Sequence, residues 1–246
     1  MDDKQLLRYS RQIMLPEIDV DGQERIKNSK VLLIGLGGLG SPISIYLTAA
    51  GVGELIIADF DKVNLSNLQR QILHKTRDIN RSKIDSAKEH LHELNPDINI
   101  RSIGKKLSEN DLMNEAKKSN IIIDASDNFN TRFSLNKISV KSKTPLVSGA
   151  AIRFEGQVTV FNPAQKSSPC YRCLYNEDVS TEESCTANGV FAPLLGIVGS
   201  IQANEALKLI LNLGESIQGK LLLIDALNME FNEVFLNKDP SCPVCN

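Results

Sequence analysis

The segment from Lys30 to Gly40, KVLLIGLGGLG, decides which fold this chain is expected to adopt. An apolar run ends at Ile34, a glycine-rich turn follows, and residues 39–50 then carry apolar side chains at helical spacing. Glycines between a strand and a helix are typical of a phosphate-binding turn, because they let backbone N–H groups approach anionic oxygens at the helix N-terminus. The glycines of this turn are Gly35, Gly37, Gly38 and Gly40. The segment therefore predicts a nucleotide site.

The alternation of strand and helix continues to about residue 150. Apolar runs ELIIAD, INIRSI, IIIDASDN and TPLVSG alternate with helical patterns, which include residues 81–94 and 128–141. Continuous apolar strands alternating with helices predict an α/β fold, a Rossmann-like and mostly parallel sheet covered on both faces. Beyond residue 150, IRFEGQVTVF and FNEVF alternate apolar and polar residues and predict antiparallel strands that extend the sheet. A long apolar helix is expected from Pro193 to about Asn212.

The charge balance and the N-terminus exclude several classes of protein. Lys and Arg number 28 against 30 Asp and Glu, so the formal charge is −2 and nothing favours nucleic acid as a partner. The first residues, MDDKQLLRYSRQ, lack the apolar stretch of a secretory signal. The longest apolar run, Val190 to Ile201, is shorter than the ~20 residues of a membrane span. We expect a soluble cytoplasmic protein with no membrane partner.

Cysteine is the most informative residue type. Four of the five cysteines form two C-x-x-C pairs, Cys170 with Cys173 and Cys242 with Cys245. Disulfides are disfavoured in a chain without an export signal, and Zn²⁺ takes four tetrahedral thiolate ligands, so a structural zinc site is the preferred interpretation. Two redox pairs or inert buried thiols are the alternative. The fifth cysteine, Cys185, belongs to neither pair.

Polar residues follow the second and fourth strands, where a parallel sheet places its ligand crevice. Asp59 closes the second strand and is placed to hold ribose hydroxyls, which alone would fit an NAD(P)-dependent oxidoreductase. However, Arg70 and Lys83 follow, and such cations suit the breaking of a triphosphate, which requires stabilisation of charge on leaving oxygens. After the fourth strand, Asp127 is a natural ligand for Mg²⁺ or a cap for the next helix. The histidines, His74, His90 and His92, are expected at the surface.

The ordered motifs resemble one family over essentially the whole chain. The chain resembles the ubiquitin-activating-enzyme-like adenylyltransferases of sulfur-carrier pathways, the molybdopterin-synthase and thiamine-biosynthesis activating enzymes. The motifs that carry the resemblance are RYSRQI, GLGGLG, DFDKVNLSNLQRQ, DASDN, CYRC, the region of Cys185, GIVGSIQANEALK and SCPVC.

The resemblance implies a role for each matching residue. Gly38 and its neighbours would hold the ATP phosphates, Asp59 and Asp61 would lie at the nucleotide, and Asp127 would organise Mg²⁺. Lining or contacting the nucleotide would be Ser66, Asn67, Leu68, Gln69, Arg70, Lys83 and Asn128. Arg11 would reach into the site of a second subunit, which implies a homodimer. Cys170, Cys173, Cys242 and Cys245 match structural zinc ligands.

The resemblance also implies the reaction and the partners. The C-terminal glycine carboxylate of a small ubiquitin-fold sulfur carrier ending in Gly-Gly would be adenylated by ATP, with sulfur coming from a separate donor. Residues 1–246 would form one adenylation domain: a helical arm (1–28), a nucleotide-binding half (29–150), and a carrier-binding and zinc half (151–246). The thiol of Cys185 either links covalently to the carrier or is a bystander. A non-catalytic, zinc-stabilised scaffold of the same fold remains the alternative to an enzyme.

Overall fold

The computed structural model describes residues 1–176 and 188–246. Its helices are α1 (Asp3–Arg8), α2 (Ser10–Ile13), α3 (Asp19–Lys27), α4 (Gly40–Ala50), α5 (Lys83–Leu94), α6 (Glu109–Ala116), α7 (Phe129–Ser142), α8 (Tyr171–Leu174) and α10 (Ala192–Leu211), with short 3₁₀ turns η1 (Leu65–Asn67) and η2 (Thr76–Asp78). Its strands are β1 (Lys30–Ile34), β2 (Glu54–Ala58), β3 (Asn99–Ile103), β4 (Ile121–Asp124), β5 (Leu146–Ile152), β6 (Glu155–Phe161), β7 (Lys220–Asp225) and β8 (Glu230–Phe235).

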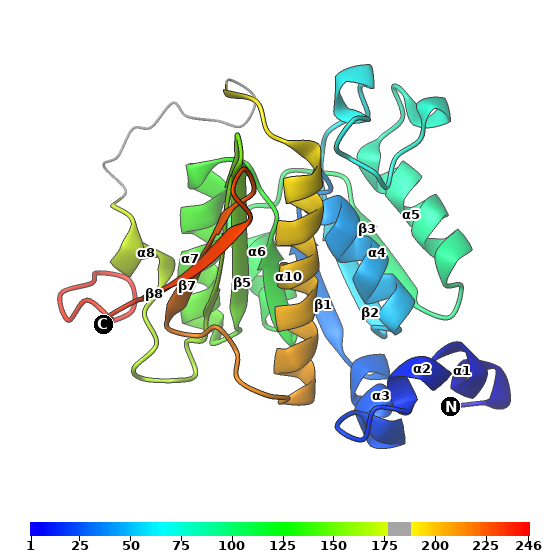
Figure 1. Ribbon diagram of the computed structural model, residues 1–246, viewed down its shortest axis with the longest axis horizontal. Coiled ribbons are helices and arrows are strands. Elements are labelled where there is room, and N and C mark those ends of the chain that lie inside the picture. The colour runs from blue at the N-terminus through cyan, green and yellow to red at the C-terminus, as the bar shows by residue number, and fades with distance from the viewer. Residues whose placement is uncertain (177–187) are drawn as a thin grey trace.

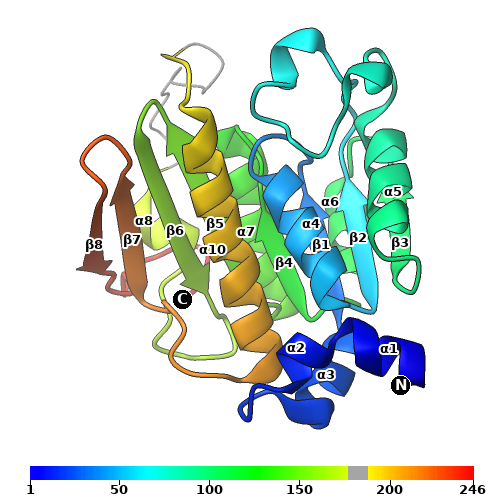
Figure 2. The ribbon, with the colours of Figure 1, turned by 45° about the vertical axis from the view of Figure 1, so that its right-hand side comes forward.

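These strands form a single sheet in the order β3-β2-β1-β4-β5-β6-β7-β8. The first five strands of this order are parallel and the last three pair antiparallel. Helices α4, α5 and α10 cover one face, and α6, α7 and α8 lie on the other (Figures 1 and 2). The mostly parallel α/β sheet with an antiparallel extension is therefore confirmed.

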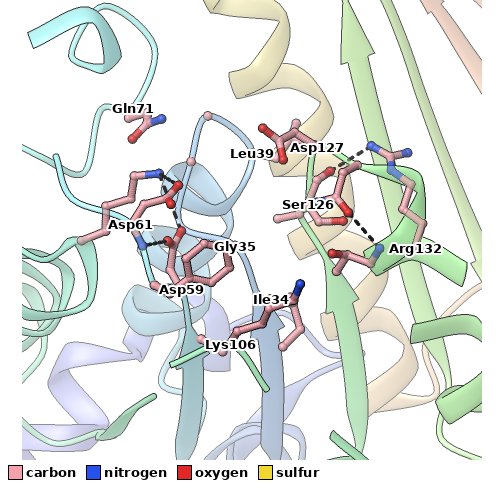
Figure 3. A pocket seen from close by; sticks show the side chains of 18 of the residues that line it. Ile34, Gly35, Leu39, Asp59, Asp61, Gln71, Lys106, Ser126, Asp127 and Arg132 are labelled. Atoms are coloured by element: carbon pink, nitrogen blue, oxygen red, sulfur yellow. Dashed lines mark hydrogen bonds and ion pairs between the residues drawn. The ribbon is translucent and has the colours of Figure 1, made fainter. Parts of the chain in front are cut away.

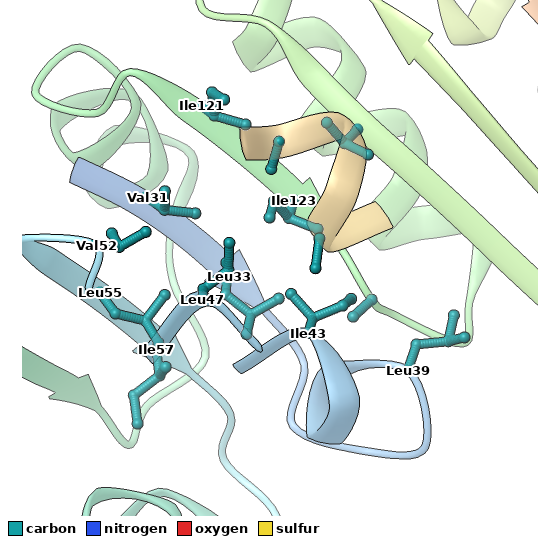
Figure 4. Close-up of a cluster of buried hydrophobic side chains, with 14 of the residues drawn as sticks. Val31, Leu33, Leu39, Ile43, Leu47, Val52, Leu55, Ile57, Ile121 and Ile123 are labelled. Atoms are coloured by element: carbon teal, nitrogen blue, oxygen red, sulfur yellow. The ribbon is translucent and has the colours of Figure 1, made fainter. Parts of the chain in front are cut away.

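The two apolar faces explain why the central strands read as continuous apolar runs. In β1, Val31 and Leu33 point into the core under α4, whereas Leu32 points into the core under α6 and α7. All three side chains are fully buried. Figure 4 shows Val31 and Leu33 packed with Ile43 and Leu47 of α4. Because side chains alternate between faces, only a strand that is buried on both sides needs apolar residues at every position.

Helix α10 is the long apolar helix expected from the sequence. By length and composition alone it could cross a membrane, but half of its apolar window is buried within the protein. Leu194 and Val198 have no exposed surface, and the helix packs against α4 and β5. Helix α10 therefore packs as a core helix of the protein.

The antiparallel extension differs from the sequence prediction in three respects. IRFEGQVTVF is not one strand, because Arg153 and Phe154 form the tight turn between β5 and β6, with Arg153 at φ 51°. This turn contains none of the glycines or asparagines that usually mark a hairpin. Strand β7 was not predicted. Strand β8 was predicted, but its alternation does not correspond to a buried face, since all six of its residues are exposed.

The prediction that the histidines lie at the surface is wrong for two of the three. His74 is buried, and its ring nitrogens lie 2.9 Å from Ser86 Oγ and 3.2 Å from the carbonyl oxygen of Leu36. Burial lowers its pKa. His90 is also buried, with Nε2 2.7 Å from Asp78 Oδ2. Their partners lie 12 to 38 residues away, so the sequence pattern did not reveal them.

Asp78 is the centre of this buried polar network. Its carboxylate accepts hydrogen bonds from the Lys75 backbone N–H and from Arg81 Nη1, and it faces His90. Burial alone would raise the pKa of Asp78, but the hydrogen bonds to its carboxylate outweigh it and hold the pKa well below its usual range.

We predict that Asp78→Ala lowers the free energy of unfolding by about 3 kcal/mol at neutral pH, because it leaves buried donors without an acceptor. The folded-state pKa is depressed, so this stabilisation is present above the unfolded pKa of about 4 and is lost as the pH falls below it. Urea unfolding of both proteins at several pH values measures the difference. Asp97→Ala, which removes a half-exposed carboxylate 3.9 Å from Arg8, is the control. An equal loss for the two variants would contradict the assignment.

Candidate functional site

A cavity of about 600 Å³ opens at the carboxyl ends of β1, β2 and β4 (Figure 3). Its wall brings together segments that are far apart in the sequence. They are the glycine-rich turn, the end of β2, Arg70 with Gln71, the start of α5, the loop before α6, and the turn from β4 into α7. This is the edge at which an open parallel sheet binds ligands.

The glycine-rich turn brings backbone segments together more closely than side chains would permit. Gly35 has φ +96°, and a Cβ there would lie 2.6 Å from the carbonyl oxygen of Ala125. A Cβ on Gly40 would lie 2.0 Å from the carbonyl oxygen of Gly35. Gly35, Gly37 and Gly38 line the cavity, whereas Gly40 packs α4 against the end of β1. The turn thus presents its own backbone and the N-terminus of α4 to the cavity.

A lysine and two aspartates form the wall on the β2 side. Asp59 accepts hydrogen bonds from the backbone N–H of Leu36 and of Asp61, both at 2.8 Å. Figure 3 shows Asp59 and Asp61 next to each other on this wall. Lys83, at the start of α5 and 7% exposed, donates to Asp61 at 2.9 Å and lies 3.8 Å from Asp59. The site therefore holds a cation that is nearly dehydrated and that two carboxylates keep in place.

The segment from Ser66 to Arg70 reaches the cavity only at its end. Arg70 lines the wall, and its Nη1 donates to the Ser66 carbonyl at 2.9 Å. Asn67 instead closes a local turn, accepting a hydrogen bond from the Asn64 backbone N–H. Ser66, Asn67, Leu68 and Gln69 lie beside the cavity, not in its wall. A nucleotide contact for these four residues stays a prediction.

The turn after β4 carries Asp127 into the cavity, and Asn128 caps the helix that follows. Asn128 Oδ1 accepts a hydrogen bond from the Thr131 backbone N–H, so the interpretation of Asp127 as the helix cap is wrong. Within residues 1–176 and 188–246, Asp127 makes no hydrogen bond or ion pair. Its carboxylate is exposed to the cavity and available to a ligand.

A further predicted site residue, Arg11, lies away from this wall. Arg11 is exposed on α2, and helices α1 to α3 lie at the opposite end of the sheet, where the strand β1 begins (Figures 1 and 2). Cys185 lies outside the described residues. A contact from Arg11 to the cavity of its own chain is therefore excluded by the fold.

The four cysteines of the two C-x-x-C pairs meet in one cluster beside α7. The Sγ atoms of Cys170 and Cys242 are 3.7 Å apart, and those of Cys173 and Cys245 are 3.5 Å apart. Burial raises the pKa of Cys170 to about 11. For Cys242, burial also acts to raise the pKa, but backbone N–H groups of Val244 and Cys245 outweigh it and lower the pKa to about 7.

The family model that matches this chain is described as the ThiF family and covers residues 9–244. The chain belongs to the ThiF family. It is 44% identical to the molybdopterin-synthase adenylyltransferase of Escherichia coli (strain K12), covering 100% of this chain and 98% of the relative. It is 41% identical to the sulfur carrier protein ThiS adenylyltransferase of the same organism, covering 100% of this chain and 97% of that relative. A crystal structure of E. coli MccB with MccA-N7isoASN shares the fold, with a TM-score of 0.84, 25% identity, and coverage of 97% of this chain and 75% of that one.

Several residues of this ThiF-family site were missed from the sequence. Gln71, Lys105, Lys106 and Arg132 all line the cavity. Gln71 adjoins the predicted residue Arg70, so its motif could have indicated it. The lysines precede α6, and Arg132 lies within α7, where a charged residue ordinarily faces solvent.

We predict that Gly40→Ala lowers the free energy of unfolding by at least about 2 kcal/mol, because the new Cβ meets backbone that is unable to move aside. An alanine within a helix is ordinarily stabilising relative to glycine, so the sign itself is informative. Gly37→Ala is the matched control, since its nearest neighbour would be the Gln71 side chain at 3.6 Å. Denaturant unfolding measures both variants. Equal stability of the two would contradict the close approach at Gly40.

Proposed function

We propose that this protein is an ATP-dependent adenylyltransferase that activates the C-terminal glycine carboxylate of a small ubiquitin-fold sulfur carrier. The carrier would belong to molybdopterin or thiamine biosynthesis. The observation that carries the proposal is one cavity in which the glycine-rich turn, Lys83, Arg70 and Asp127 face a common space. Relatives that match this chain over its full length are named adenylyltransferases of such carriers.

The reaction requires charge stabilisation more than proton transfer. One oxygen of the carrier carboxylate forms a bond to the α-phosphorus of ATP. The bond from that phosphorus to the oxygen bridging to the β-phosphate breaks, and its electron pair leaves with pyrophosphate. A carboxylate is already ionised at neutral pH, so no general base is needed. Lys83 and Arg70 counter the charge on the phosphate oxygens, and the backbone of the glycine-rich turn positions them.

Asp127 would hold the Mg²⁺ that accompanies ATP. The donor set fits, because Asp127 is a cavity carboxylate without a partner among the described residues, and Mg²⁺ takes one or two carboxylates together with phosphate oxygens. Bound there, the ion would neutralise charge on the phosphates. Asp59 would accept hydrogen bonds from the ribose, and Asn128 would lie beside the ion.

The four-cysteine cluster fits a structural zinc ion. Sulfur atoms at the corners of a tetrahedron, about 2.3 Å from a central zinc, lie about 3.8 Å from one another. The measured separations of 3.5, 3.7 and 3.9 Å agree with this distance. Asn136 also donates a hydrogen bond to Cys170 Sγ at 3.5 Å, as outer-shell partners of metal-bound thiolates do. We assign the site a stabilising role.

The protein would act as a homodimer of single-domain subunits. A homodimer would place Arg11 of one subunit at the phosphates of the other, since the fold separates it from its own cavity. The whole chain would act as one adenylation domain. Residues 1–28 would be the arm to the second subunit, 29–150 would hold the nucleotide, and 151–246 would bind carrier and zinc.

We predict that Arg70→Ala abolishes carrier-dependent exchange of pyrophosphate into ATP, because it removes a cation from the cavity wall. The melting temperature should stay close to that of the wild type, since among the described residues the guanidinium makes a single hydrogen bond, to the nearby Ser66 carbonyl. Exchange against a panel of carriers ending in Gly-Gly measures the activity. Arg77→Ala, an exposed cation paired with Glu89 and Glu93, is the control. Wild-type levels of pyrophosphate exchange by Arg70→Ala would contradict the proposed function.

We predict that Cys242→Ser loses bound zinc and lowers the melting temperature, with activity falling only as a consequence. Metal binding at a closed thiolate site contributes on the order of 10 kcal/mol of folding free energy, and serine is a poor replacement for a thiolate ligand. Metal analysis and thermal unfolding on the same preparation test this. A wild-type protein without zinc, or an unchanged melting temperature in the variant, would contradict the assignment.

A further inference from the structure

Helix α7 carries a buried cation that the reaction described above does not use. Arg132 is 8% exposed and lies one helical turn before Asn136, the residue that contacts the cysteine cluster. Its Nη2 donates a hydrogen bond of 2.9 Å to the carbonyl oxygen of Ser126 (Figure 3). Ser126 directly precedes Asp127 in the turn between β4 and α7. The guanidinium therefore holds the turn at the peptide that joins Ser126 to Asp127.

A buried carboxylate holds the same turn from the other side. Asp124, the last residue of β4, has no exposed surface, and its Oδ1 accepts hydrogen bonds from the N–H of Ser126 at 2.9 Å and its hydroxyl at 2.6 Å. Burial raises the pKa of Asp124, and the charge of Arg132 acts against this rise. Gln202 of α10 donates to the Asp124 carbonyl at 2.8 Å and fixes the end of the strand.

These contacts leave one group of the turn free. The carbonyl, N–H and hydroxyl of Ser126 are all engaged, and Asn128 caps α7. The Asp127 carboxylate alone has no partner within the described residues, and it faces the cavity. An arrangement that engages Ser126 on three sides and leaves the Asp127 carboxylate to the ligand resembles the outer shell of a metal site, where supporting residues orient the ligating group.

We propose that Arg132 is a positioning residue: through the Ser126 carbonyl it fixes the turn so that the Asp127 carboxylate is aimed at the Mg²⁺ of bound Mg–ATP. The assignment rests on the proposed function, since it takes ATP with Mg²⁺ as the ligand of this cavity. Arg132 itself touches neither phosphate nor metal in this role. Its loss should therefore weaken the contribution of the metal to binding and leave the contacts between protein and metal-free ATP in place.

The test is the affinity for ATP, measured by calorimetry in EDTA and across a range of Mg²⁺ concentrations. Arg132→Lys keeps a cation beside the buried Asp124, which protects the fold, but it lacks the planar fork that reaches the Ser126 carbonyl. We expect the Mg²⁺ concentration for half-maximal enhancement of ATP binding to rise about tenfold or more, as for other outer-shell substitutions. Affinity in EDTA should stay within about twofold. Lys141→Met, an exposed cation of the same helix paired with Glu109, is the control and should change neither value.

A second variant separates positioning from folding. The double substitution Asp124→Asn with Arg132→Met removes both buried charges together, so neither is left uncompensated. It should retain zinc and a cooperative unfolding transition and show the same shift in Mg²⁺ dependence. Unchanged Mg²⁺ dependence in Arg132→Lys, or equal losses of affinity in EDTA and in Mg²⁺, would overturn the assignment. Failure of the wild-type protein to bind ATP under either condition would instead overturn the proposed function itself.

Discussion

The structure depends on the close approach of three backbone segments at Gly35, Gly40 and Ala125. The absence of Cβ atoms at the two glycines lets the end of β1, the start of α4 and the end of β4 come together. This contact places a helix N-terminus and the ends of two parallel strands around one space. The charged groups of the cavity acquire their common orientation from it, because each is attached to a segment whose direction the contact sets.

The buried polar network extends this constraint to α5. The Leu36 carbonyl, in the glycine-rich turn, meets the His74 ring, which in turn meets Ser86 of α5. Since a carbonyl oxygen only accepts hydrogen bonds, His74 Nε2 carries the proton, and the low pKa of the buried ring keeps the imidazole neutral. Lys83 lies on the first turn of the same helix. The glycine-rich turn and Lys83 are thus joined through packed, hydrogen-bonded groups.

Helix α7 contacts both the cysteine cluster and the turn at the cavity. Asn136 donates to Cys170 Sγ and accepts from the Tyr171 backbone N–H, while Arg132, one turn earlier, holds the turn that carries Asp127. Tyr171 is buried between Phe133 of α7 and Phe161 of β6. This packing anchors the cysteine cluster to the face of the sheet that α7 covers. The cysteine cluster and the cavity are therefore attached to one element, helix α7.

The sequence by itself determined the parallel core, the glycine-rich turn and the cysteine cluster. These features arise from local rules: apolar runs such as KVLLI form doubly buried strands, glycine spacing permits one kind of turn, and a C-x-x-C pair brings two thiolates to one point. Strand β1 lies where the pattern predicts it. Only the tertiary structure decided the burial of His74 and His90, the role of Asn128 in place of Asp127 as helix cap, the turn at Arg153, and the place of Arg132 in the cavity wall. The partners of the two histidines lie 12 to 38 residues away, whereas Asn128 and Arg132 bond groups within six residues of themselves. In both cases a polar side chain carries no local mark of whether water or a protein group will satisfy it.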